Sequence, residues 1–426
     1  MSNSNCIRIT LNIKDQNIIF GEDYIKLEVI NKIETQVYTG ILSPPTPKKC
    51  KKCGNKNKKN SLIKNGSKMV TIKIPSVSYH KAILRLKKQR YLCKKCNQTF
   101  CAETNLVERN RTISNNTSLA CLVEAKDKTS IKDIAKRFNI SPSTLNNRLG
   151  DVSKAFKINY NYLPENLSFD EFKSVKSVLN KMSFIYADSE NGKIIDIVQN
   201  RRLSYLKAYF FRYPLEVRQR VKTVCIDMYE PYIQLIISCF PNAKIITDRF
   251  HIVQHINRAL NSARVAAMKD NKEYYARYKR YWKLLLVDHA NLDCTEYKKY
   301  VGYPHFMTAS GVVADLLTQD KTLASTYWLS QYLKQAIRSK NIEEFKRLIT
   351  TQHVDICPQM ETVLKTFRKQ ENYIINALSY SFSNGRLEGT NNLIKVIKRI
   401  AFGYRNFFNF RSRILLISNT MLELDL

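Results

Sequence analysis

A basic segment near residue 390 contains one isolated carboxylate, Glu388. If the residues from Leu387 onward form a helix, four polar side chains at i, i+4, i+7 and i+11 share one narrow stripe: Glu388, Asn392, Lys395 and Arg399. The stripe could be a solvated polar face supported by i,i+4 pairs. It could instead combine an acid that holds a metal ion with bases that hold a phosphate group. The helix alone does not decide between these two interpretations.

Four cysteines in two Cys-x-x-Cys pairs are a second set of residues that could do chemistry. Cys50 and Cys53 make the first pair, and Cys93 and Cys96 make the second. Two thiolates at this spacing can hold one side of a tetrahedral Zn²⁺, so the two pairs predict one structural zinc ion per chain. Cysteines that remain free thiols are the alternative.

The residues around the cysteine pairs are typical of a zinc ribbon over residues 48–111. Gly54 and Asn97 directly follow the pairs, and both tolerate the positive φ that a tight knuckle needs. Between the pairs, "KMVTIKIP" and "KAILRLKKQRYL" are predicted strands. The stretch holds 19 Lys and Arg against two acids, which indicates a module that contacts DNA. The alternative is a purely structural ribbon with a solvated charged surface.

The charge of the whole chain indicates the same kind of partner. Its 426 residues carry a net charge of +34 with a pI of about 9.7, and the bases are interleaved with 24 Tyr and 19 Phe. A polyanionic partner explains this excess. Nucleic acid fits better than a membrane surface, because the bases are spread over the whole chain. The alternative is a basic protein with no such partner.

No membrane segment or secretion signal is expected. The chain has no run of 18 apolar residues, and its first 20 residues lack a basic region followed by an apolar one. We therefore expect no membrane partner and a reducing, cytoplasmic location, in which disulfides are not expected.

The segment 112–160 contains "TSIKDIAKRFNISPSTLNNRL", which predicts two short helices with a turn between them. Ser130 or Thr129 can cap the first helix, and Ser141 with Pro142 can begin the second. This is the pattern of a helix-turn-helix, whose second helix would read a DNA major groove. Small helical hairpins that do not bind DNA share the pattern. The side chains expected to face outward and contact DNA are Ser143, Thr144, Asn146, Asn147 and Arg148.

From Leu167 onward the pattern changes to strands alternating with helices. "LSFDEFK" is a predicted strand that bears Asp170, and "MSFIYADSENGKIIDIVQNR" predicts two strands joined by an Asn-Gly hairpin. "YLKAYFFRYPLEVRQRV" is a predicted helix. Two further buried strands end in Asp227 and Asp248, with a helix between them. This order is that of the ribonuclease H-like fold, and in open α/β sheets ligands gather at the carboxyl ends of strands.

The predicted architecture is a multidomain α+β protein. Residues 255–380 are predicted to be helical throughout, as an all-α insertion before the helix that bears Glu388. The predicted domains are an N-terminal segment without an assigned role (1–47), a zinc ribbon (48–111), a helix-turn-helix domain (112–160), and a ribonuclease H-like α/β core (165–426) with the helical insertion at about 255–380.

These features occur together, and in the same order, in a known group of proteins. The two Cys-x-x-Cys pairs, the helix-turn-helix, "FDEF", "CIDMYEPY", "TDRFHIVQ" and "NGRLEGTNNLIKVIKRIAFGYRNF" extend over nearly the full length. On these motifs the chain resembles the ISL3 family of bacterial insertion-sequence transposases. The resemblance implies a nucleoid-associated DDE transposase that binds the ends of an insertion sequence and catalyses metal-dependent DNA strand cleavage and strand transfer.

The resemblance also implies which residues act. Asp170, Asp227 and Glu388 match the family's catalytic triad and would bind two Mg²⁺ or Mn²⁺ ions, which activate the nucleophile and stabilise the leaving oxygen. Asp248 and His251 match a D-x-x-H element of related transposases and are possible accessory residues. Asp248 could support the metal ligands or orient His251. His251 could contact DNA or simply be a hydrogen-bonded residue at the start of a helix.

The expected partner is double-stranded DNA, both transposon ends and target, bound by a homodimer or a larger assembly. Lys395 and Arg399 would hold the DNA backbone, and Arg201 and Arg202 are further expected contacts. Two other functions stay open at this point. One is a DNA-binding regulator or domesticated remnant with an inert core, and the other is a ribonuclease H-like nuclease without strand transfer.

Overall fold

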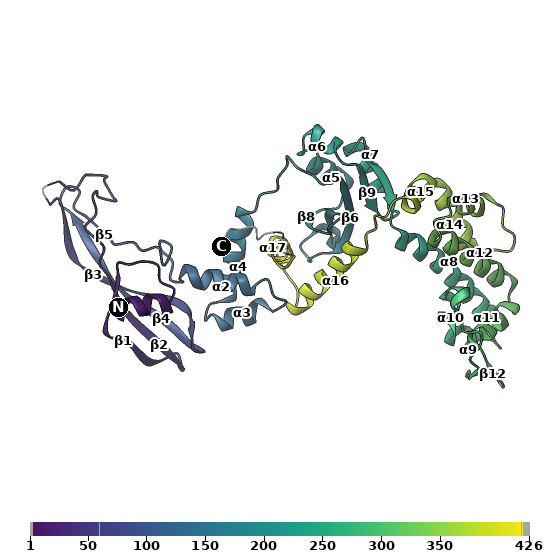
Figure 1. The fold of residues 1–426 in the computed structure, drawn as a ribbon, viewed down its shortest axis with the longest axis horizontal. Helices are drawn as coiled ribbons and strands as arrows, with labels where there is room; N and C mark the ends of the chain where they lie inside the picture. The colour runs from purple at the N-terminus through teal and green to yellow at the C-terminus, as the bar shows by residue number, and fades with distance from the viewer. Residues whose placement is uncertain (1–2, 59, 419, 421–426) are drawn as a thin grey trace. The chain divides into compact units, whose positions relative to one another are not determined.

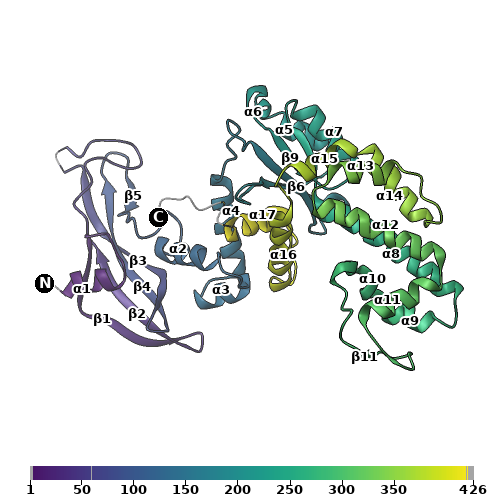
Figure 2. The ribbon, with the colours of Figure 1, turned by 45° about the vertical axis from the view of Figure 1, so that its right-hand side comes forward.

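A computed structural model describes residues 3–58, 60–418 and 420 of the chain (Figures 1 and 2). The predicted domain bounds at residues 1 and 426 lie outside the described residues. The chain divides into two compact units: the residues up to Lys157 together with those from Ile394 onward form the first, and Ile158–Leu393 form the second. The second unit is therefore inserted into the first along the chain.

A five-stranded sheet carries the N-terminal part of the first unit. Its strands are β1 (Ile18–Ile30), β2 (Ile33–Leu42), β3 (Leu62–Val77), β4 (His80–Cys93) and β5 (Gln98–Cys101). They lie in the order β1-β2-β4-β3, with β5 paired to β4. β2 and β4 are parallel and the other pairs are antiparallel. No role was predicted for residues 1–47. In the structure β1 and β2 belong to the same sheet as the strands between the cysteine pairs.

Alternating apolar side chains form the core of this sheet. Leu84 and Leu86 on β4 are fully buried, together with Ile18 on β1 and Ile72 on β3. Helix α1 (Asn3–Thr10) packs on β1 and adds Ile7 to the same core.

Three short helices follow the sheet: α2 (Asn115–Glu124), α3 (Ile131–Arg137) and α4 (Pro142–Ala155). Ser130 caps α3, because its hydroxyl accepts a hydrogen bond from the Asp133 backbone N–H. Ser141 caps α4 in the same way, with Pro142 in the first turn. The predicted helix starts at both positions are therefore confirmed.

Helix α17 (Phe407–Ile417) completes the core of these three helices, although it lies about 250 residues further along the chain. Leu416 is buried there with Leu145. The fully buried Arg413 donates hydrogen bonds to the backbone carbonyls of Asp127 (2.9 Å) and Thr129 (2.6 Å). The predicted α/β core reached to residue 426. In the structure α17 instead packs on α4, because its apolar face fills the core of the small helical group.

A second five-stranded sheet opens the second unit. Its strands are β6 (Asn166–Lys173), β7 (Met182–Asp188), β8 (Ile194–Val198), β9 (Thr223–Ile226) and β10 (Lys244–Thr247). Their order is β10-β9-β6-β7-β8. β6, β7 and β8 are antiparallel neighbours, whereas β6, β9 and β10 run parallel. In the predicted Asn-Gly hairpin between β7 and β8, Gly192 has a φ of +77°, which glycine adopts without a Cβ penalty.

Helices α5 (Leu203–Phe210), α6 (Leu215–Gln219) and α7 (Glu230–Cys239) bury aromatic and aliphatic side chains against this sheet. Phe210 of α5 and Leu235 of α7 are fully buried with Phe169 of β6. A single helix was predicted over residues 205–221, and this prediction was wrong. Pro214 separates α5 from α6, because proline has no backbone N–H and its ring clashes with the preceding helical turn.

The segment after β10 is mainly helical. It contains α8 (Arg249–Asp270), α9 (Tyr275–Arg280), α10 (Trp282–Leu286), α11 (Ala309–Thr318), α12 (Lys321–Arg338), α13 (Ile342–Thr350), α14 (Pro358–Lys369) and α15 (Glu371–Ser379). A small antiparallel pair, β11 (Lys298–Lys299) with β12 (Phe306–Met307), corrects the prediction of helix throughout. α8 and α12 lie side by side in both views (Figures 1 and 2). Within the described ranges, no helix combines the length and the apolar character needed to cross a bilayer.

Helix α16 (Gly385–Ile400) forms where the basic segment predicted it. Leu387, Ile394 and Ile397 are buried. Val396, which was expected on the apolar side, is 40% exposed. All four residues of the polar stripe are exposed: Glu388, Asn392, Lys395 and Arg399.

Candidate active site and metal centre

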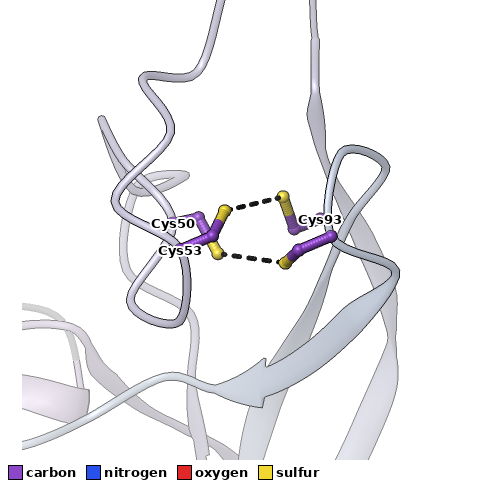
Figure 3. A group of neighbouring side chains, drawn as sticks. Cys50, Cys53 and Cys93 are labelled. Carbon is purple, nitrogen blue, oxygen red and sulfur yellow. Dashed lines mark hydrogen bonds between the residues drawn. The ribbon is translucent and has the colours of Figure 1, made fainter.

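The four cysteines of the two pairs come together in the first unit (Figure 3). Their Sγ atoms all lie within 4.8 Å of one another, and the Cys50–Cys96 and Cys53–Cys93 Sγ distances are both 3.9 Å. Sulfur atoms placed tetrahedrally around Zn²⁺ at about 2.3 Å stand about 3.8 Å apart. The group therefore has the donors and the dimensions of a structural zinc site.

The backbone of both knuckles has the predicted conformation. Gly54 has a φ of +71° and Asn97 a φ of +52°. Hydrogen bonds from the backbone N–H groups of Cys53 and Lys52, the latter at 3.3 Å, lower the pKa of the Cys50 thiol to about 7. Burial raises the pKa of Cys96 to about 12. Cys50 and Cys96 are therefore not equally ready to ionise, and a bound divalent cation would favour the thiolate form of its ligands.

Three aspartates stand in one row across neighbouring parallel strands of the second unit. Asp170 lies on β6, and Asp227 and Asp248 directly follow β9 and β10. The register of β6 with β9, continued by two residues, sets Asp170 opposite Asp227. The register of β9 with β10, continued by one residue, sets Asp227 opposite Asp248, whose N–H donates to the Ile226 carbonyl at 2.8 Å. Since neighbouring strands lie about 4.8 Å apart, three carboxyl groups meet at one edge of the sheet.

Burial raises the pKa of all three carboxyl groups. Desolvation, with a contribution from the charge of Asp227, brings the pKa of Asp170 to about 6. Desolvation also raises the pKa of Asp227 and of Asp248, while His251 acts in the opposite direction on both. The charge of Glu388 adds to the rise at Asp248. His251 and Glu388 are therefore electrostatic neighbours of the row. Within the part of the chain that the structure describes, no three of these side chains offer ligand atoms that all lie within 4.8 Å of one another.

Two asparagines tie the first turns of α16 to the aspartate row. Asn391 Nδ2 donates to Asp170 Oδ2 at 2.8 Å. Asn384, directly before α16, donates its backbone N–H to Asp248 Oδ1 at 3.3 Å and its Nδ2 to a backbone carbonyl of β6 at 2.9 Å. Glu388 lies between these two asparagines in the chain, so the contacts hold the helix that bears it against the row.

Arg201, one of the expected DNA contacts, is held by protein groups beside this row. Its guanidinium forms an ion pair with Glu171, and the Tyr232 hydroxyl donates to the same carboxylate at 3.0 Å. The guanidinium also lies over the Tyr229 ring, 5.6 Å from its centroid. The hydrogen bond that Arg201 donates to the Glu171 carboxylate raises the pKa of Arg201 further, so the guanidinium stays charged. Its neighbour Arg202 is exposed.

Helix α4 carries the five residues expected to face outward and read DNA. The structure places four of them at least partly at the surface: Ser143, Thr144, Asn146 and Asn147. Arg148 was expected to face outward, and this was wrong. Its residue exposure is 7%, and its guanidinium pairs with Glu108 at 3.2 Å and Asp151 at 3.6 Å. Arg148 lies three residues after the buried Leu145 on α4, and Glu108 reaches it from a loop 40 residues earlier.

Three residues of this region were missed by sequence reasoning. Asn391 stands three residues after Glu388, so helical spacing alone could have placed both on one face of α16. Asn384 lies in the turn before α16, where its only sequence signal is the preference of asparagine for turns. Glu171 follows Asp170 in a strand and therefore points to the opposite face, where Tyr232 and Arg201 bind it.

Two family models match the chain. A DDE model of the ISL3 type, described as transposase, matches residues 167–414, which include the aspartate row and Glu388. A model described as zinc-finger of transposase IS204/IS1001/IS1096/IS1165 matches residues 46–96, which include all four cysteines. The prediction of a zinc ribbon is confirmed by this match and by the geometry of the cysteine group.

Two named relatives align with the chain. The transposase for insertion sequence element IS1001 of Bordetella parapertussis is 23% identical over 345 residues, which are 77% of this chain and 79% of the relative. A Lactococcus lactis subsp. lactis protein named ATP-dependent protease is 26% identical over 231 residues, which are 54% of this chain and 72% of the relative. That name belongs to the relative. No two glycines of this chain stand five residues apart, so it lacks the phosphate-binding loop G-x-x-x-x-G-K-[ST].

The transposase model covers more than half of the 426 residues, and the zinc-finger model adds the ribbon that precedes it. The similarity to the IS1001 transposase extends over most of both chains. The chain therefore belongs to the ISL3 family of DDE transposases and is a DNA transposase.

Proposed function

We propose that Asp170, Asp227 and Glu388 are the catalytic triad of this transposase and bind two Mg²⁺ or Mn²⁺ ions for DNA strand cleavage and strand transfer. The observation that carries the proposal is the aspartate row together with the Asn391–Asp170 hydrogen bond of 2.8 Å, which ties α16 to that row. Segments that are 57 and 161 residues apart in the chain supply the three acids. The same matched family region, residues 167–414, contains all of them.

The second sheet supports a ribonuclease H-like core as the scaffold of the triad. Numbered along the chain, its five strands lie in the order 5-4-1-2-3. Strands 1, 2 and 3 are antiparallel to one another, whereas strands 1, 4 and 5 are parallel. Helices α8 to α15 intervene between β10 and α16, so we propose that they form an insertion in this core. The insertion separates the two strand acids from Glu388 in the chain.

The donor set fits hard divalent cations. Carboxylate oxygens are the side-chain ligands that Mg²⁺ prefers, and Mg²⁺ keeps waters in its remaining positions. Desolvation and the charge of Asp227 raise the pKa of Asp170 to about 6, so a cation beside the row would offset an unfavourable concentration of charge.

Metal ions held there would lower the pKa of the attacking water or 3′-hydroxyl and stabilise the leaving oxygen. Asp170 and Asp227 are fixed by the sheet, while Glu388 approaches from an exposed position on α16. We assign Asp248 a positioning role, because its carboxylate accepts the N–H of Asn384 at the start of that helix. His251 is proposed as an accessory residue beside the row, where it could contact DNA.

Recognition of the transposon ends is proposed for the first 150 residues. The basic ribbon supplies charge for phosphate contacts, and α3 with α4 is proposed as a helix-turn-helix that presents Asn146 and Asn147 to base edges. Lys395 and Arg399, both exposed on α16, are proposed to hold the DNA backbone. The active form on double-stranded DNA is proposed to be a homodimer or a larger assembly.

A strand-transfer assay tests the proposed chemistry. The substrates are a duplex with the terminal inverted repeat and a free 3′-hydroxyl, a supercoiled target plasmid, and Mg²⁺. A transposase joins the donor end to the plasmid, a nuclease without strand transfer only cuts, and an inert core binds the end without either reaction. Joining should be lost in Asp227→Asn while end binding is kept. Wild-type joining by this variant would contradict the proposed triad.

A further inference from the structure

We propose that a cavity between α8 and α10 holds a nucleobase of the DNA substrate that has left the base stack. The proposal rests on the DNA transposase function and adds a ligand site outside the triad. The cavity has a volume of about 570 Å³, within the range of small-ligand sites. The lining side chains that matter here are Phe250, Gln254, Asn257, Arg258, Trp282 and Leu286.

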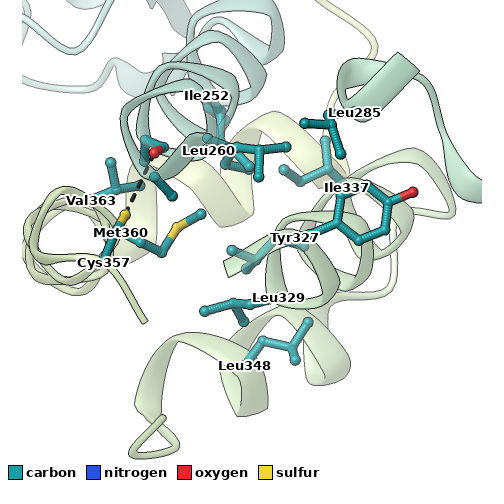
Figure 4. Close-up of a cluster of buried hydrophobic side chains, with 14 of the residues drawn as sticks. Ile252, Leu260, Leu285, Tyr327, Leu329, Ile337, Leu348, Cys357, Met360 and Val363 are labelled. Carbon is teal, nitrogen blue, oxygen red and sulfur yellow. Dashed lines mark hydrogen bonds between the residues drawn. The ribbon is translucent and has the colours of Figure 1, made fainter. Parts of the chain in front are cut away.

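Helix α8 has one face that packs in the core and another that lines the cavity. Ile252 and Leu260 point into the buried core of the helical region, where they meet side chains of α12 and α14 (Figure 4). Phe250, Gln254 and Asn257 recur at i, i+4 and i+7 on the other side of the same helix and line the cavity. The cavity face therefore differs in composition from the core face, because it carries an aromatic ring and two amides where the core face carries aliphatic side chains.

Helix α10 repeats this division on a smaller scale. Leu285 is buried in the helical core, as Figure 4 shows. Trp282 and Leu286, at i and i+4, line the cavity opposite α8. The two helices are in contact, so the cavity walls belong to one packed region.

Two aromatic side chains of the cavity are open to solvent. Phe250 is 50% exposed and Trp282 is 38% exposed. Aromatic faces are the platforms on which unstacked bases bind, and they accept every base because each base has a π-face. In a protein with a net charge of +34 that acts on DNA, a base is the aromatic ligand that the substrate itself supplies.

The polar groups of the cavity suit the edge of a base. The Oδ1 atom of Asn257 is buried and has no hydrogen-bond partner among the described residues. A buried acceptor without a donor is costly, and an exocyclic amino group or ring N–H of a base would satisfy it. Gln254 adds a second amide, and the exposed Arg258 adds a positive charge for the neighbouring phosphate.

The cavity begins next to Asp248 and His251, the proposed positioning and accessory residues beside the aspartate row. Phe250 is two residues after Asp248, and its ring packs edge-on against His251 with 5.5 Å between the ring centroids. Asn257 lies nine residues after Asp248, or about 14 Å along the helix. This is about four base-pair steps of 3.4 Å. A base within a few nucleotides of the cleaved phosphate can therefore reach the cavity, and its removal from the stack would open the strand at the active site.

The two tryptophans of the chain provide a matched test. Trp282 lines the cavity, whereas Trp328 on α12 does not, and their exposures are 38% and 39%. In Trp328→Phe, only Trp282 emits, and we expect quenching when a duplex of the terminal inverted repeat binds. In Trp282→Phe, only Trp328 emits, and its emission should not change. Binding is followed separately by the anisotropy of a dye on the DNA.

Two results of this titration would overturn the cavity proposal. A duplex that binds by anisotropy without changing the Trp282 emission would overturn it and leave the triad intact. A duplex that does not bind at all would count against end binding as well, so the two failures are distinguishable.

A cleavage assay with a modified base locates the site. With 2-aminopurine placed at successive positions near the cleaved phosphate, emission should change at one position, and Trp282→Ala should abolish that change. Trp282→Ala should cleave about 5- to 100-fold more slowly, and Trp328→Ala at the wild-type rate. An abasic nucleotide at that position should relieve the defect, because no base must then be unstacked.

Equal rates for the two alanine variants would overturn the proposal. A Trp282→Ala defect that the abasic nucleotide does not relieve would also overturn it, and would assign Trp282 a structural role or a protein partner. Trp282→Phe keeps an aromatic face and should retain most of the cleavage activity, which separates loss of stacking from misfolding.

Discussion

The cysteine group of the ribbon and the proposed metal-binding row of aspartates in the second unit differ in how closely their donor atoms are gathered. The four Sγ atoms already lie within 4.8 Å of one another. The acids do not form such a group within the described ranges, and burial raises the pKa of each aspartate. A closed group of thiolates suits an ion that stays and stabilises the fold. A looser row of carboxylates suits ions that share their remaining ligands with a phosphate of the substrate.

Loss of the ribbon metal should have the largest effect, because it breaks the more assembled site. Structural zinc contributes about 10–16 kcal/mol in zinc-finger peptides at neutral pH. Cys93→Ser should therefore unfold the ribbon and abolish binding to transposon ends, and metal analysis should fall from one zinc per chain to none. Cys101→Ser, which changes a cysteine outside the group, should keep the zinc. Full folding and end binding in strong chelator would contradict the zinc site.

Loss of one proposed triad acid should have the next largest effect and should leave the fold intact. Asp170→Ala, Asp227→Ala and Glu388→Ala should each slow strand cleavage about 10³-fold or more, since metal-assisted charge stabilisation supplies much of the barrier reduction. End binding should persist. Mn²⁺ should replace Mg²⁺, and Ca²⁺ should allow binding without cleavage.

Asp188→Ala is the matched control for the triad. The Asp188 carboxylate accepts hydrogen bonds from the Glu190 N–H (2.8 Å) and from Asn191 Nδ2 (2.7 Å) within the hairpin turn. This variant should lose some stability and keep most of its cleavage activity. Full cleavage by Glu388→Ala would remove the proposed triad.

Variants of Arg148 and Asn146 on α4 distinguish a residue that stabilises the fold from one that contacts DNA bases. Arg148→Ala should destabilise the first unit by about 2 kcal/mol, because its buried guanidinium pairs with Glu108 and Asp151. Asn146→Ala should leave the denaturation midpoint unchanged and relax the choice of end sequence. Denaturant unfolding and competition binding measure the two effects. The reverse pattern would show that Arg148 leaves its partners to read the groove.

A variant of Asn391 tests whether its hydrogen bond links the aspartate row to α16. Asn391→Ala removes the 2.8 Å hydrogen bond to Asp170 and should slow cleavage about 10-fold, the equivalent of about 1.4 kcal/mol. Asn392→Ala, which changes an exposed neighbour, should cost much less. Equal effects would indicate that the first turns of α16 are positioned by other contacts.

The pH dependence of stability should show the smallest effect. The pKa of Asp170 is about 6 in the folded chain, above its ordinary value of 3.8. The metal-free protein therefore loses stability as pH rises from about 4 through 6, because the carboxyl is then ionised in the unfolded chain but still largely protonated in the folded one. The Tm change that Asp170→Asn causes in the metal-free protein should be about 2–4 °C more positive at pH 7.5 than at pH 4. An equal change at both pH values would contradict the raised pKa.

The local features of both regions could be predicted from the sequence. Gly54 and Asn97 mark the two knuckles in the sequence, because few residue types tolerate a positive φ. Both residues have a positive φ in the structure. Asp227 and Asp248 are recognisable because each directly follows a short run of buried β-formers. Such signals depend only on the few residues around them.

Contacts between distant segments could not be predicted in the same way. Helical spacing left Arg148 facing outward, because the loop that carries Glu108 has no sequence signal for its position. The pairing of β2 with β4 is parallel and therefore not marked by a tight turn. Asn384 was missed because its two partners, the Asp248 carboxylate and a carbonyl of β6, lie more than 130 residues earlier.

The packing of α17 on α4 has a consequence for protein synthesis. The helices from Asn115 to Ala155 leave the ribosome early, but their core lacks Leu416 and the anchor made by Arg413 until α17 has been translated. That is about 250 residues later, or about 12–50 s at 5–20 residues per second. A prematurely terminated chain therefore carries an incomplete version of this helical group. If these helices recognise the ends of the element as proposed, abortive translation products are expected to be poor competitors for those ends, and occupancy of the DNA is coupled to the synthesis of α17.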